Sequence, residues 1–188
     1  MTKFIIALTL LLSLETTYAN MEALPFSYSA TDSYSVEEEF YHQQDDDELK
    51  DLAEANATPE GRAVLVSART MIENQVIILG SCWDYIHEIF NRAGYPLKQR
   101  LTPYKMKKTG PYASVDQIKG GDWLYFINHS FGGVEHSAIF VEWIDLEARE
   151  ALMISYAGGN REAPARYKTY DLSSVYNIIR AKPKKLAP

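Results

Sequence analysis

The pattern of apolar and polar positions changes near residue 58, where a polar stretch gives way to helical periodicity. Thr58 is a suitable N-cap, and Pro59 suits the first position of a helix because its missing N–H would have no partner there. Apolar side chains then recur at helical spacing, at Val64, Ala68, Met71 and Ile72. The pattern predicts a first helix that begins at residue 59.

A second helix is expected after the apolar run VIIL, residues 76–79. Ser81 can cap it, and Gly94, with Pro96 close behind, can end it. Its apolar face would consist of Ile86, Ile89, Phe90 and Ala93. This assignment places Cys82 in the first turn of the helix.

The second half of the chain reads as consecutive strands. Residues 123–127 are aromatic and β-branched, and residues 138–141 form a short apolar run. The loop HSFGG between them suits a hairpin, and the segments EALMISYAGGN and VYNIIRAKP supply two more strands. Helices followed by such strands predict an α+β fold, in which N-terminal helices pack on a small antiparallel sheet.

The first twenty residues resemble a secretory signal peptide. Lys3 precedes the apolar stretch FIIALTLLLSL, and Thr17 and Ala19 supply small side chains before a cleavage site. The apolar stretch is short for a membrane span. We therefore expect residues 1–19 to be removed near Ala19 and the protein to be secreted or periplasmic, with no integral membrane segment left.

Charge divides the remaining chain. Residues 20–60 hold 12 acidic residues against one lysine, a net charge of −11, whereas residues 61–188 hold 17 basic and 12 acidic residues, a net charge of +5. We expect 20–57 to be an acidic, disordered arm and 58–188 to be the folded domain. The arm either is a solubilising spacer or folds back over the basic domain through Phe40 and Tyr41.

Cys82 is the chain's single cysteine. In an oxidising compartment it cannot form an internal disulfide, so it pairs with another chain, lies inert in the core, or reacts. The unpaired N–H groups of a helix's first turn stabilise a thiolate and can donate to an oxyanion. The position therefore suits a nucleophile.

The chain's four histidines are the candidates for a general base. His42 lies in the acidic arm, and His87 lies five residues after Cys82, on a different face of the same helix. His129 falls in the hairpin loop, whereas His136 opens a strand that can hold it against a helix N-terminus. His136 is thus the preferred base.

Several segments, taken in order, resemble the bacterial cell-wall cysteine peptidases of the NlpC type, which are similar to papain with the chain circularly permuted. The resemblance runs from Arg62 to Gly158 and covers most of the expected domain. Its segments are the helix AVLVSARTMI, the nucleophile turn GSCWDYIHEIFNRAGYPL, the element IKGGDWLYF and the strand HSAIFVEW. In the third, Gly120 replaces the proline of the family's P-G-D signature.

The resemblance implies catalytic roles. Cys82 would attack an amide carbonyl, and His136 would take its proton and later protonate the leaving amine. Ser155 matches the third position, where the family usually has His, Asn or Gln. Serine is short, so it would act through a water, or Asn160 or Tyr156 would substitute for it.

The resemblance also implies a substrate-binding set around the nucleophile. Typical members read D-C-S-G, with the Asp and Ser holding a free amine, whereas the corresponding residues here are Ser81, Trp83 and Asp84. Tyr85 lies about one helical turn beyond Cys82 and would border the site together with Tyr156.

These inferences predict a cysteine hydrolase that cuts an amide in peptidoglycan stem peptides. We expect a monomer whose partner is peptidoglycan or its fragments, with no nucleic acid, metal or organic cofactor. Alternatives on the same fold are a CHAP-like N-acetylmuramoyl-L-alanine amidase and an acyl transferase or thioesterase. Others are a catalytically inactive cell-wall binding module and a homodimer joined through Cys82.

Overall fold

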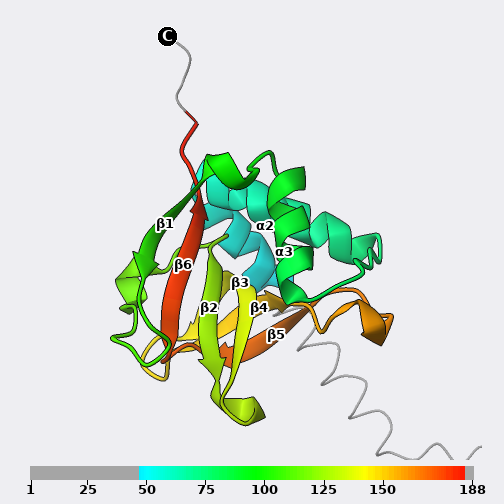
Figure 1. The fold of residues 1–188 in the computed structure, drawn as a ribbon. Helices are drawn as coiled ribbons and strands as arrows, with labels where there is room; N and C mark the ends of the chain where they lie inside the picture. Colours follow the sequence, from blue (N-terminus) through cyan, green and yellow to red (C-terminus); the bar gives the residue numbers. More distant parts are fainter. Residues whose placement is uncertain (1–46, 185–188) are drawn as a thin grey trace, which may run out of the picture. The chain divides into compact units, whose positions relative to one another are not determined.

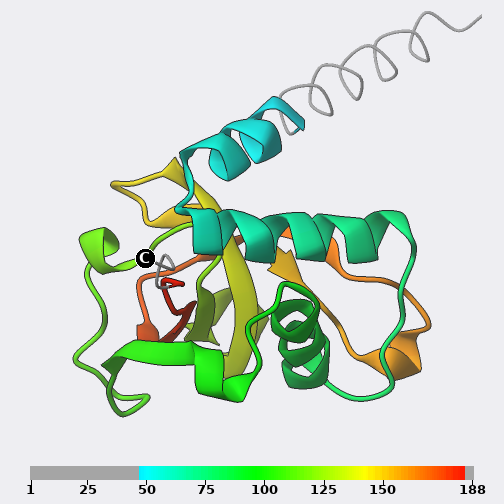
Figure 2. The same cartoon turned by 90° about the horizontal axis from the view of Figure 1, so that it is seen from above.

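The computed structural model describes residues 47–184, in which helices pack on one face of a six-stranded sheet (Figure 1, Figure 2). The expected signal peptide and the acidic arm up to residue 46 lie outside the described residues. The helices are α2 (Pro59–Glu73) and α3 (Cys82–Arg92), preceded by helical residues 47–56. The strands are β1 (Arg100–Lys105), β2 (Trp123–Asn128), β3 (Val134–Asp145), β4 (Glu150–Ser155), β5 (Arg166–Asp171) and β6 (Val175–Ala181).

Both predicted helices are confirmed, with their caps. The Thr58 hydroxyl accepts a hydrogen bond from the Gly61 N–H at the start of α2. Ser81 caps α3 and forms a reciprocal capping box with Asp84, which satisfies two N–H groups that the helix leaves unpaired. Beyond α3 the chain turns at Gly94, whose φ of 86° is one that glycine adopts without strain.

The sheet has the strand order β1-β6-β2-β3-β4-β5, and every pair of neighbours is antiparallel. The α+β prediction is therefore confirmed. Side chains alternate between two buried faces. Trp123 and Ile139 pack against the helices, whereas Phe126 and Phe140 pack in a second apolar cluster on the other face.

The sequence pattern missed the strands at both edges of the sheet. β1 contains Pro103, which is tolerated at an edge because no neighbour needs its missing N–H. β5 reads RYKTYD, and half of its side chains are exposed, so it lacks a continuous apolar run. The four predicted strands correspond to β2, β3, β4 and β6, with Gly132 and Gly133 at positive φ in the expected hairpin loop.

The acidic segment differs from the expected disordered arm over its described part. Residues 47–56 are helical, with Ala53 buried and Leu49 packed against the core. Arg69 of α2 forms an ion pair with Glu54 at 2.7 Å. Folded structure thus begins before residue 58, because this acidic segment also presents apolar side chains to α2 and the sheet.

The glycine turn before β2 packs closely against the first turn of α2. A Cβ at Gly121, where φ is 86°, would lie 2.5 Å from the Gly61 carbonyl oxygen, so only glycine permits this approach. The next residue, Asp122, is buried and accepts two hydrogen bonds from Arg180 of β6, at 2.6 and 2.7 Å. This ion pair fixes the turn to strand β6 of the sheet.

No helix within residues 47–184 has the length and apolar character needed to cross a membrane.

Candidate active site

Cys82 and His136 line the same cavity. Cys82 is the first residue of α3 and is half-buried, and His136 lies near the start of β3. The cavity has a volume of about 230 Å³, and its remaining walls are Trp83, Tyr125, Glu135, Ser137 and Tyr176. The structure thus brings together the predicted nucleophile and the predicted base.

The thiol of Cys82 contacts β3 through Ser137, whose hydroxyl donates a hydrogen bond to Sγ at 3.5 Å. Among the described residues, no hydrogen bond joins Cys82 to His136. Neighbouring side chains on a strand point to opposite faces, so Ser137 faces α3 while His136 turns towards the second apolar cluster. Ser137 is a contact of Cys82 that the sequence pattern did not identify.

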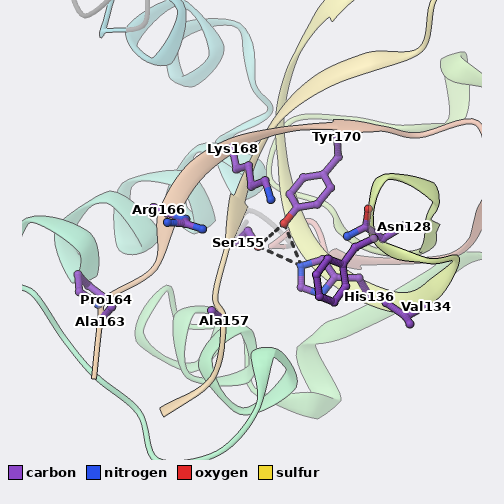
Figure 3. A pocket seen from close by; sticks show the side chains of 11 residues that line it. Asn128, Val134, His136, Ser155, Ala157, Ala163, Pro164, Arg166, Lys168 and Tyr170 are labelled. Carbon is purple, nitrogen blue, oxygen red and sulfur yellow. Dashed lines mark hydrogen bonds between the residues drawn. The ribbon is translucent and has the colours of Figure 1, made fainter. Parts of the chain in front are cut away.

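The His136 ring is held by two hydroxyl groups (Figure 3). Its Nε2 lies 3.0 Å from the hydroxyl oxygen of Ser155 and 3.4 Å from that of Tyr170. The two hydroxyl groups are 2.9 Å apart, so the three polar groups form a closed triangle. The edge of Phe126 packs against the ring, with centroids 5.6 Å apart. These contacts engage Nε2 and leave Nδ1 as the other nitrogen able to carry a proton.

Tyr170 is the group that the sequence analysis missed at this position. It lies on β5, an unpredicted strand, and its phenol reaches the space that the short Ser155 side chain leaves open. Asn160, considered as a substitute, is exposed in the short helix Gly159–Arg161 and makes no hydrogen bond to His136. The orienting group therefore combines Ser155 with Tyr170.

The environment of His136 favours the neutral imidazole. Burial lowers the pKa of His136 below its ordinary value, and the positive charge of Lys168 lowers it further. Since an imidazole accepts a proton only in its neutral form, His136 is suited to act as a base near neutral pH.

A second cavity, of about 480 Å³, also has His136 in its wall (Figure 3). His136, Ser155 and Tyr170 line it together with two cations of β5, Arg166 and Lys168. The larger cavity therefore borders His136 and the two hydroxyl groups that hold its ring, whereas Cys82 lines the smaller one.

Ser81 and Asp84 serve the start of the helix. The Asp84 carboxylate accepts hydrogen bonds from the Ser81 N–H at 2.7 Å and from the Ser81 hydroxyl at 2.9 Å. These bonds, that from the N–H first, lower the pKa of Asp84. Both residues were predicted to bind substrate; neither lines the Cys82 cavity, and their hydrogen bonds order the turn that carries Cys82.

Tyr85 and Tyr156 were also predicted to bind substrate, but the structure places both in the core. They are 0% and 1% exposed, and their rings stack with centroids 4.2 Å apart. The Tyr156 hydroxyl accepts from the Ile78 N–H at 3.1 Å and donates to the Ile78 carbonyl at 2.7 Å. One turn beyond Cys82 is the apolar face of α3, which explains the burial of Tyr85, and Tyr156 holds the segment before Cys82 through Ile78.

Trp83 remains at the expected place. It is 42% exposed, lines the Cys82 cavity and stacks on His87 with ring centroids 4.7 Å apart. Tyr125, across the same cavity, keeps its phenol proton, because burial raises the pKa of Tyr125 to about 12. The indole of Trp83 and a neutral phenol thus line the cavity of Cys82.

Within residues 47–184, no cluster of three or more His, Cys, Asp or Glu side chains is arranged to hold a metal ion. In comparisons with known proteins, no family model, no curated protein and no solved structure matches the chain.

Proposed function

We propose that the protein is an exported cysteine hydrolase that cuts an amide bond in peptidoglycan stem peptides. The observation that carries the proposal is the cavity shared by Cys82, at the N-terminus of α3, and His136, whose ring is held by Ser155 and Tyr170. The order of the elements supports a permuted papain-like arrangement of the NlpC type. In that order a helix carries the nucleophile, the base opens β3, and the orienting hydroxyl ends β4.

In the first step, His136 activates the thiol. Nε2–H donates to the Ser155 oxygen, which leaves a lone pair on Nδ1. The thiol turns from Ser137 towards the imidazole, its proton passes to Nδ1, and the sulfur electron pair forms a bond to the amide carbonyl carbon. The N–H groups of Ser81 and Trp83 are engaged in the helix cap, so the backbone N–H of Cys82 at the start of α3 is the group that stabilises the resulting oxyanion.

In the second step, the carbon–nitrogen bond breaks and the imidazolium of His136 gives its proton to the departing amine. A thioester on Cys82 remains. Neutral His136 then takes a proton from water, whose oxygen attacks the thioester carbon, and the same proton returns to the sulfur as the acid leaves. The sum is hydrolysis of one amide, and neither residue is consumed.

A second candidate is a binding module of the same fold without catalytic activity. The hydrogen bond of the Cys82 thiol to Ser137 rather than to His136 favours it, because no proton path joins thiol and imidazole until the thiol rotates. The two candidates differ in whether a bound peptide is cut.

The test is incubation of the purified protein with cell-wall sacculi, followed by mass spectrometry of the soluble fraction. We expect released peptides whose new ends identify the amide that is cut. Cys82→Ser is expected to abolish release, and His136→Ala to lower its rate by roughly 100-fold or more, since general base catalysis contributes that much.

His129→Ala is the matched control. His129 binds Ser174 at 2.7 Å and lines neither cavity, so release is expected to persist. Sedimentation of the protein with sacculi, without any released peptide, would instead establish the binding module.

A further inference from the structure

The larger cavity beside His136 is lined by two cationic side chains that take no part in the proposed cleavage of the amide. We propose that Arg166 and Lys168 form a subsite there for a free carboxylate of the substrate, close to the amide that is cut. The inference rests on the proposed function, and it names the class of substrate as a peptide with an ionised carboxyl group near the scissile bond.

The sheet places both cations beside the base. Arg166, Lys168 and Tyr170 alternate along β5 and so share one face of the strand. Arg166 pairs with Ser155 across the β4–β5 ladder, and Ser155 contacts His136. Figure 3 shows the side chains of Arg166 and Lys168 on the same cavity as His136.

Neither cation has an acidic partner among the described residues. Ion pairs engage other basic side chains there, such as Arg69 and Arg180, but none includes Arg166 or Lys168. The Lys168 ammonium lies 5.1 Å from the centre of the Tyr170 ring, a contact that leaves its donors free for an anion. Two cationic side chains at a concave site thus lack a carboxylate that would neutralise them.

The rest of the lining agrees with an anionic ligand. Among the described residues, no acidic side chain lines the larger cavity, whereas Glu135 lines the cavity of Cys82. Asn128 adds an amide, and exposed Phe131 and Val134 offer apolar contact to a peptide backbone. A peptide whose carbonyl lies at Cys82 and that extends into the larger cavity, which His136 also lines, would therefore meet positive charge there.

The carboxylate can belong to the acyl side of the scissile amide or to the leaving amine, and a set of peptides separates the two. The probe is the peptide L-Ala-γ-D-Glu-L-Lys-D-Ala in three forms. One has both carboxyl groups free, one has the glutamate α-carboxyl amidated, and one has the terminal carboxyl amidated. Their affinities for the Cys82→Ala protein are measured by calorimetry, so that binding is observed without turnover.

We expect one amidated form to bind roughly tenfold or more weakly, because a charge-assisted pair with Arg or Lys is lost. The form that loses affinity identifies the side of the bond. In the double variant Arg166→Gln, Lys168→Gln the preference for the acid over that amide is expected to disappear. Lys105→Gln, an exposed lysine on β1 at the opposite edge of the sheet, is the control and is expected to retain it.

Equal affinity for all three peptides would overturn the subsite, and so would a preference that survives the double variant. Turnover by the unmodified protein separates this result from the proposed function. Cleavage without any acid preference would refute only the subsite, whereas an acid preference without cleavage would refute only the hydrolase. Failure to bind any of the peptides would overturn both.

Discussion

The imidazole Nε2 of His136 and the hydroxyl oxygen of Ser155 lie 3.0 Å apart, across the β3–β4 ladder. The contact engages Nε2 of the ring. The serine side chain is short, and the Tyr170 hydroxyl supports it. The oxygen atoms of the two hydroxyl groups are 2.9 Å apart, and both lie near the same imidazole nitrogen. The proposed mechanism requires both hydroxyl groups to hold Nε2 of His136 in place.

Removal of the Tyr170 hydroxyl tests that support. Tyr170→Phe keeps the ring packing and deletes the contacts to Ser155 and His136, so we expect the rate of peptide release to fall about 2- to 10-fold, the value of one hydrogen bond. The measurement is kcat at saturating peptide, with KM unchanged. A rate equal to that of the unmodified protein would show that Ser155 orients the ring without help.

Lys168 is expected to set the acid limit of the activity. Its positive charge disfavours the imidazolium and, together with burial as the larger cause, lowers the pKa of His136. Activity should therefore rise with pH as His136 loses its proton. Because the pKa of His136 lies below its ordinary value of 6.5, this acid limb of the pH profile should lie below pH 6.5.

In Lys168→Met the charge is gone, so the pKa of His136 should rise and the acid limb of kcat/KM should move to higher pH. Lys105→Met, on the far edge strand, should leave the limb in place. A limb that moves equally in both variants would exclude a local effect of Lys168.

The Asp122–Arg180 ion pair is predicted to be a major source of stability. Asp122 is 1% exposed, and Arg180→Met would leave its carboxylate buried without a counter-charge. We expect the free energy of unfolding to fall by about 3–5 kcal/mol, measured by urea denaturation. Adding Asp122→Asn to Arg180→Met should recover part of the loss; a further loss would contradict this explanation.

Tyr156 provides a test of the corrected assignment of the substrate-binding set. Tyr156→Phe leaves the N–H and carbonyl of Ile78 without their partner, so the free energy of unfolding should fall by about 1–3 kcal/mol. Because Tyr156 lines neither cavity, KM for the peptide should stay unchanged. A raised KM at unchanged stability would restore the sequence-based role.

The sequence was sufficient for the elements that carry clear periodicity. Thr58 and Ser81 gave the starts of both helices, and the apolar runs gave the four inner strands. It was insufficient at the edges, because β1 and β5 bury too few side chains to show a strand pattern.

The missed edge strand explains why part of the site was missed. Arg166, Lys168 and Tyr170 all lie on β5, and only the pairing of β5 with β4 brings them to His136. Tyr85 shows the opposite error: its spacing from Cys82 is that of one helical turn, but that face of α3 is buried against Tyr156. Spacing gives proximity along a helix and does not reveal which face meets solvent.

The most direct test of the central claim is the rate at which the folded protein reacts with iodoacetamide between about pH 4 and pH 10, compared with His136→Ala. The thiolate is the reacting form, and an unperturbed thiol forms it only near pH 8.5. If Cys82 and His136 act as a pair, the native protein will react rapidly well below that pH, and His136→Ala will shift the profile to higher pH. Reaction only after unfolding, or a profile that does not change without His136, would contradict the account and leave Cys82 as a core residue of a binding module.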